Sequence, residues 1–272
     1  PTPARQAGPT RDARERAYRS NNAGVALLEQ LKYPEAAAAF RQALTIDSTL
    51  AISHLNLSLA LLYDQNMDEA VKEATEASTR MPSAPQPSYV LGLIARAQNR
   101  NAEAKTFFEK VRAIDGGDIG VNVNLAQIAL EDRRYDDAVG ALQPIVTREP
   151  YHVTASYVLG LALTRGGQAE QGQALLEKAQ ELRRANYAVT FGTGYLEQGR
   201  YAEAIATTGS EPDLVDPSVP ATRFSRNDIG GTAAVAPVVS PFGRRLAQGD
   251  LSEAGLRQPA AGPGGGQTLT DI

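Results

Sequence analysis

Few side chains in this sequence could support acid–base or nucleophilic chemistry. Only His54 and His152 can exchange protons near neutral pH, and neither stands in a catalytic or metal-ligand motif. The sequence has no cysteine, which excludes disulfides, thiol nucleophiles and thiolate metal sites. We therefore expect both histidines to be structural, and we expect no catalytic residue, no metal and no cofactor.

The paired acids and the glycine pairs have structural explanations as well. Asp136 and Asp137 fall where a helix is expected to begin, and carboxylates there are stabilised by the positive end of the helix dipole. Gly116-Gly117-Asp118 and Gly166-Gly167 lack the preceding strand and the Lys or Gly spacing of a phosphate loop. These segments are therefore expected to be turns.

Composition and charge restrict the partners and the fold. The formal net charge is −4, and Arg is interleaved with Glu and Asp, so no basic surface for nucleic acid is evident. Hydrophobic residues make up 42% of the chain but aromatic residues only 6%, and Ala and Leu dominate, which favours closely packed helices. No apolar run approaches the roughly 20 residues that would span a bilayer. The initial Pro is compatible with a removed leader and with a start inside a longer gene product.

A period of 34 residues organises most of the chain. At the eighth position of successive windows stands a small residue, and at the twentieth stands Ala or Gly, so that two antiparallel helices can approach closely. Each window then reads as helix, turn, helix and stop, because Pro or Gly follows the second helix. The small residues are Gly24, Ser58, Gly92, Ala126 and Gly160 at position eight, and Ala36, Ala70, Ala104, Ala138 and Gly172 at position twenty.

These positions resemble the tetratricopeptide repeat, with Phe40 and Phe108 at the aromatic position twenty-four. The resemblance implies an all-α, right-handed solenoid of antiparallel helix pairs with about five and a half repeats. A sixth unit is expected to start early, placing Tyr201 at position seventeen and Ala204 at position twenty, and to lose its second helix at Gly209. The predicted divisions are an N-terminal linker and helix start at 1–16, a solenoid at 17–208 with units 17–50, 51–84, 85–118, 119–152, 153–184 and 185–208, and an arm or linker at 209–272.

The same resemblance implies a binding groove on the concave face, lined by the first helix of each unit. Position six carries Asn22, Asn56 and Asn124, whose amides can both donate to and accept from a peptide backbone. No Lys or Arg occupies positions five, six or nine, which disfavours a ligand held by its C-terminal carboxylate. The alternative is that these are ordinary repeat residues that pack between helices. The other groove residues expected are Leu55, Leu59, Tyr89, Leu93, Val123, Gln127, Tyr157 and Leu161.

The tail, rich in Pro, Gly, Ala and Val, leaves two interpretations open. It is either a flexible linker or an extended arm that docks on its own or a neighbouring solenoid. Residues 250–256 and 264–272 resemble the entry into an FG-GAP/VCBS-type propeller of secreted bacterial proteins, which implies a larger, extracytoplasmic gene product, either periplasmic or secreted. A cytoplasmic location stays open. The docking interpretation rests on Val235, Val238, Val239 and Phe242, which are more apolar than a solvated spacer requires.

Two classes of function follow from the sequence. The first is a non-catalytic scaffold that binds an extended polypeptide segment in its groove. The second is a structural subunit that self-assembles into an extracellular filament, with the arm docked on its own or a neighbouring copy. An enzyme would need a catalytic domain beyond Ile272.

Overall fold

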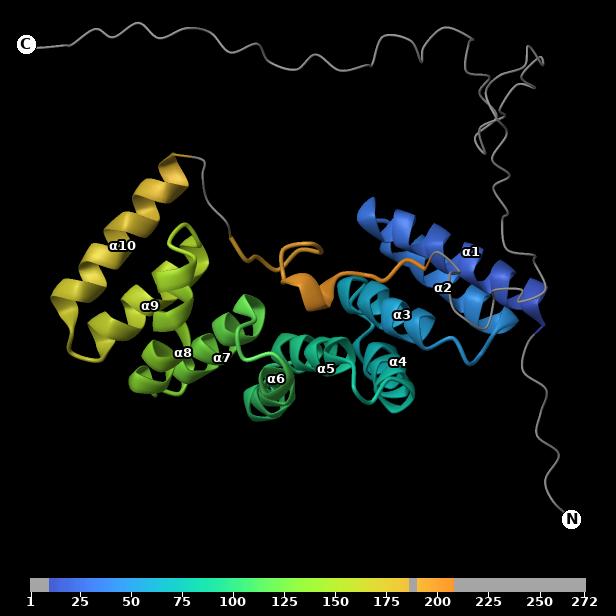
Figure 1. Cartoon of the computed structure of the whole chain (residues 1–272), viewed down its shortest axis with the longest axis horizontal. Helices are drawn as coiled ribbons and strands as arrows, with labels where there is room; N and C mark the ends of the chain where they lie inside the picture. Colours follow the sequence, from blue (N-terminus) through green and yellow to red (C-terminus); the bar gives the residue numbers. More distant parts are fainter. Residues whose placement is uncertain (1–9, 186–189, 208–272) are drawn as a thin grey trace, which may run out of the picture. The chain divides into compact units, whose positions relative to one another are not determined.

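The computed structural model describes residues 10–185 and 190–207, all within the first of two compact units, residues 1–217. Consecutive helices of these ranges pack as five pairs, and each pair contacts the next (Figure 1). The predicted all-α solenoid is thereby confirmed. The helices are α1 (Arg11–Glu29), α2 (Tyr33–Ile46), α3 (Ala51–Tyr63), α4 (Met67–Arg80), α5 (Pro85–Ala97), α6 (Asn101–Ile114), α7 (Ile119–Glu131), α8 (Tyr135–Arg148), α9 (Val153–Arg165) and α10 (Ala169–Arg184).

Close helix approach depends on the small residues at position eight. A Cβ atom added to Gly24 would lie 2.5 Å from the ring of Phe40, and one added to Gly92 would lie 2.8 Å from the ring of Phe108. Position eight of the first helix therefore receives the residue at position twenty-four of the second helix. Both phenylalanines are fully buried, so neither ring can move into solvent to make room.

The turns inside the pairs repeat as regularly as the helices. Each turn has one residue with positive φ, and each closes with a backbone hydrogen bond from the following amide to a carbonyl five residues earlier, for example Lys32 to Leu27. Only the fifth turn places a glycine at this position. The residues with positive φ are Leu31, Gln65, Asn99, Arg133 and Gly167, each 34 positions after the previous one.

The prediction of a sixth helical unit at 185–208 is wrong over residues 190–207, the part of it that the structure describes after α10 and its cap. Between Thr190 and Thr207 the structure contains only a short 3₁₀ helix, η1 (Arg200–Ala202). Gly192, Gly194 and Gly199 weaken any helix there, and Gly199 has a φ of 91°, outside the helical range.

Several expectations concern residues outside the described ranges. These are the arm residues Val235, Val238, Val239 and Phe242 and the propeller-like segments at 250–256 and 264–272. Within the described ranges, no helix combines the length and apolar character that crossing a membrane requires.

The contact between Gly92 and Phe108 gives the first prediction. Gly92→Leu should lower the free energy of unfolding by about 1–3 kcal/mol, because the side chain must displace a buried ring. Gly140→Leu is the matched control, since no atom lies within 4 Å of a Cβ built there. Urea denaturation of both variants measures the difference, and equal stability would contradict the packing described here.

Candidate functional site

The segment from residue 190 to residue 207, here named the docked segment, lies along one face of the helix pairs. This inner face is formed by the first helices of the units, α1, α3, α5, α7 and α9. The docked segment contacts α9 near its beginning and α3 and α1 near its end, so it runs opposite to the order of the units. Figure 1 shows it in orange beside α3 and α5.

Two asparagines of the inner face bind the docked segment through its backbone. The Asn56 side chain accepts from the Ile205 amide at 2.8 Å and donates to the Ile205 carbonyl at 2.8 Å. The Asn22 side chain accepts from the Thr207 amide at 3.0 Å and donates to the Thr207 carbonyl at 2.7 Å. Each carboxamide thus takes the place of a neighbouring β-strand, and the one-repeat separation of the asparagines matches a two-residue step of extended chain.

A buried polar network holds these amides in place. Asn21 Oδ1 accepts from Ser53 Oγ at 2.9 Å and from Asn56 Nδ2 at 2.9 Å, while Asn21 Nδ2 donates to the Ile205 carbonyl at 3.0 Å. Asn21, Ser53 and Asn56 are all fully buried. The set of amides predicted from position six omits Asn21, although the same period places it at position five.

Two tyrosines hold the middle of the docked segment. The Tyr89 hydroxyl donates to the Gln198 carbonyl at 2.5 Å and accepts from Asn124 Nδ2 at 3.4 Å. Burial, together with the charge of Asp118, raises the pKa of Tyr89, so the hydroxyl stays a proton donor. Tyr195 of the segment is buried and its hydroxyl accepts from the Ala204 amide at 3.0 Å, which closes the segment on itself.

An acidic pair at the turn between α6 and α7 binds Arg200 of the docked segment. Arg200 Nε lies 3.1 Å from Asp118 Oδ2, and Arg200 Nη2 contacts Asp115 Oδ2. The Tyr201 hydroxyl donates to the same Asp115 oxygen at 2.8 Å. This hydrogen bond lowers the pKa of Asp115, and the nearby positive charge of Arg200 lowers it further.

The beginning of the docked segment rests on α9 and its capping residue. The Phe191 amide donates to Thr154 Oγ1 at 2.9 Å, and the Phe191 ring packs against the His152 ring with 4.8 Å between centroids. His152 Nδ1 accepts from the Ala155 amide at 3.2 Å, so Nε2 carries the proton of the neutral ring. Nε2 is buried and has no hydrogen-bond partner among the described residues.

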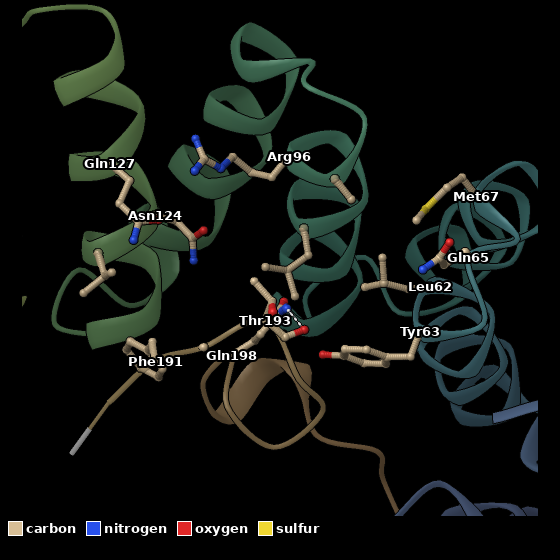
Figure 2. Close-up of a pocket in the computed structure, with 14 residues that line it drawn as sticks. Leu62, Tyr63, Gln65, Met67, Arg96, Asn124, Gln127, Phe191, Thr193 and Gln198 are labelled. Atoms are coloured by element: carbon tan, nitrogen blue, oxygen red, sulfur yellow. Dashed lines mark hydrogen bonds between the residues drawn. The ribbon is translucent and has the colours of Figure 1, made fainter. Parts of the chain in front are cut away.

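A pocket of about 740 Å³ lies between the docked segment and helices α3, α5 and α7. Figure 2 shows Arg96, Asn124 and Gln127 on one side and Tyr63, Gln65 and Met67 on the other. Phe191, Thr193 and Gln198 close the pocket from the docked segment. The docked segment therefore leaves part of the inner face unfilled.

The remaining predicted groove residues are divided between the core and the pocket. Leu55 and Leu59 are fully buried and pack in the core, whereas Leu93, Val123 and Gln127 line the pocket. Tyr157 is exposed, and Leu161 is half-buried against the second hydrophobic cluster. Their role in binding a ligand stays a prediction.

The structure gives both histidines structural partners. His54 Nδ1 lies 2.6 Å from Glu73 Oε2, and the His152 imidazole caps the N-terminus of α9. Within the described ranges, no group of three or more His, Cys, Asp or Glu side chains could hold a metal ion.

The environment of His152 predicts a dependence of stability on pH. Burial lowers its pKa below the ordinary 6.5, although the Glu149 charge acts in the opposite direction. The contribution of buried, neutral His152 to stability is complete above its pKa in the unfolded chain. It is lost as the pH falls through its lowered pKa in the folded chain. The free energy of unfolding should therefore fall as the pH is lowered from about 7.5 through the ordinary histidine pKa of about 6.5 and below it.

The control for this prediction is His152→Asn, because Asn also caps helices but does not titrate. The variant should lose less stability than the original chain over the same pH interval, measured by urea denaturation. An equal loss in both chains would contradict the role assigned to His152.

Comparison with known proteins identifies the repeats of the helix pairs. Two tetratricopeptide-repeat models match, one over residues 55–119 and 123–181 and the other over residues 95–150. Anaphase-promoting complex subunit 7 of Arabidopsis thaliana is 34% identical over 119 residues, which are 43% of this chain and 21% of that protein. The chain thus spans about a fifth of that relative's length.

Solved structures show the same fold at low sequence identity. MamA 41-end from Desulfovibrio magneticus RS-1 has a TM-score of 0.57 and 18% identity, covering 62% of this chain and 96% of that chain. YrrB, a TPR protein with an unusual peptide-binding site, has a TM-score of 0.51 and 17% identity, covering 61% and 85% of the two chains. Residues 55–181 therefore contain tetratricopeptide repeats, and the five helix pairs form a tetratricopeptide-type solenoid.

Proposed function

We propose that this protein is a non-catalytic scaffold whose inner face binds an extended polypeptide segment. The observation that carries the proposal is the double pairing of Asn22 with Thr207 and of Asn56 with Ile205. Both pairings use the peptide backbone, which every polypeptide carries. A segment of another protein could form the same bonds if it replaced the docked segment.

The energetics of the face favour an extended chain over a helix. An extended segment has unpaired amides and carbonyls, and burying them without partners costs about 1–3 kcal/mol each. The carboxamides remove this cost at two alternate residues, whereas a helical ligand has already paired its own backbone groups. YrrB, which shares the fold, is described as a peptide-binding protein and is consistent with this use of the face.

The first test removes one carboxamide. Asn56→Ala should weaken docking by about 0.5–1.5 kcal/mol for each hydrogen bond lost. The Ile205 amide should then exchange its hydrogen faster, and hydrogen–deuterium exchange of the docked segment measures this directly. The same substitution should lower the affinity of the inner face for any extended ligand that binds in place of the docked segment.

Asn124→Ala is the matched control for this test. Asn124 occupies the same repeat position as Asn56, but its Nδ2 donates to the Gly120 carbonyl and to the Tyr89 hydroxyl instead of the segment backbone. Exchange at Ile205 should change much less in this variant. If the two variants have equal effects, the position-six amides act only as ordinary repeat residues.

A second candidate function is self-assembly, in which the docked segment of one copy lies on the inner face of the next. One observation favours it: the segment follows the last helix pair yet binds the first two, so a second copy could supply an identical face. Repeated exchange of this kind builds an extracellular filament if the rotation from copy to copy does not close into a ring.

Mass measurement separates the two candidates. Light scattering after size exclusion should give a monomer for a scaffold, and a mass that increases with protein concentration for an exchanging assembly. Asn22→Ala combined with Asn56→Ala should shift an exchanging assembly towards monomers. An assembly that this variant leaves unchanged would contradict exchange of the segment.

A further inference from the structure

The docked segment has side chains that the inner face recognises separately from the backbone. Arg200 is bound by two carboxylates, and its guanidinium lies 4.7 Å above the Tyr201 ring. Tyr201 in turn lies edge-on to Tyr89, with 5.9 Å between centroids. Ala202 is 1% exposed, so the face has room for a small residue there.

We infer that the inner face selects partner polypeptides carrying a cationic residue, an aromatic residue and a small residue in succession, followed three positions later by an aliphatic one. This inference rests on the proposed function and names the class of partner. In the docked segment the pattern is Arg200, Tyr201, Ala202 and Ile205. The partner is a segment of another protein that displaces residues 190–207.

The acidic pair at the α6–α7 turn is specific to one junction between units. Asp118 stands at position thirty-four, where the other units carry Leu50, Ala84 and His152. Asp115 follows the last residue of α6, where the negative end of the helix dipole disfavours a carboxylate and favours a nearby cation. The turn between α6 and α7 therefore offers the cationic residue of the pattern two carboxylates together, which favours one register of the ligand.

Displacement is possible because the docked segment fills its face incompletely. A pocket of about 740 Å³ remains beside it, bounded by Phe191 and Gln198 of the segment. Asn124 faces this pocket and donates to the carbonyl of Gly120 in its own helix. The segment residues that line the pocket all precede Arg200. A partner whose residues before the cationic one fill the pocket gains contacts that the docked segment does not make.

The Arg200 contacts provide selectivity more than affinity. The Arg200 side chain is 61% exposed, so solvent screens its attraction to the carboxylates. A residue of the same charge as the carboxylates would be repelled at the same place, and rejection of the wrong charge is the stronger effect. At the small position, a larger side chain would meet a closely packed site.

The test uses the full chain and a fluorescent peptide with the sequence of residues 196–207. Ile205→Pro combined with Thr207→Pro in the chain removes the two backbone donors that pair with Asn56 and Asn22, and so weakens docking of the segment at its C-terminal end. Fluorescence anisotropy should show that the peptide binds this opened chain more tightly than the original chain, because the competing segment is held more weakly.

Variants of the peptide then test selectivity on the opened chain. Replacing Arg by Glu at the position of Arg200 should weaken binding roughly tenfold. Replacing Ala by Leu at the position of Ala202 should weaken it by a similar factor, roughly tenfold. A scrambled peptide should not bind at a comparable concentration.

Charge exchange in the opened chain supplies the matched controls. Asp115→Arg should restore binding of the Glu peptide and lower the affinity for the original peptide. Asp118→Asn should weaken the original peptide while keeping the α7 cap, because Asn caps as well as Asp. Asp132→Asn, which removes a carboxylate paired with Arg134, should leave both affinities unchanged.

The outcomes distinguish this inference from the function on which it rests. Equal binding of all peptides, the Glu and Leu variants included, would overturn the selectivity and leave a backbone-binding scaffold. Binding of no peptide to an opened chain that keeps its helical circular dichroism would overturn the proposed function as well. The inference requires that the Glu peptide binds the opened chain more weakly than the original peptide does, and that Asp115→Arg restores its affinity.

Discussion

The structure of the site depends on one constraint: an extended chain on a helical surface has no strand beside it. Its backbone amides and carbonyls must therefore find partners in side chains. Asn22 and Asn56 supply those partners, and Asn21 and Ser53 hold Asn56 in place through bonds that are themselves buried. Buried backbone groups of the segment that lacked a hydrogen-bond partner would oppose docking. The asparagine network therefore determines where the segment can lie.

Much of the fold could be predicted from the sequence because the period repeats a packing requirement. Gly24 and Gly92 are small for the same reason, since each faces a phenylalanine sixteen positions later. Asn22 and Asn56, which each pair with both backbone groups of one segment residue, were predictable in the same way, from a fixed place in the period. Asn21 could have been found too, since an amide at an otherwise apolar position is a signal.

The sixth unit was mispredicted because a short pattern has two physical uses. Tyr201 and Ala204 occupy the places that an aromatic and an alanine take at the start of a second helix. In the structure Ala202 is buried on the inner face and Tyr201 contacts Asp115. Pattern alone could not distinguish these outcomes, because both of them bury an alanine beside a tyrosine. The pocket was equally unpredictable, since it lies between segments distant in sequence.

The reversed direction of the docked segment changes how the solenoid can unfold. In a plain repeat array each unit contacts only its neighbours, so the ends fray independently of the middle. Here Phe191 is bound to the fifth unit and Thr207 to the first, and the Asn22–Thr207 bonds join residues 185 positions apart. The segment closes a linear array into a loop, so that both ends lose structure together. Release of the segment would convert one cooperative unit into an ordinary one-dimensional stack.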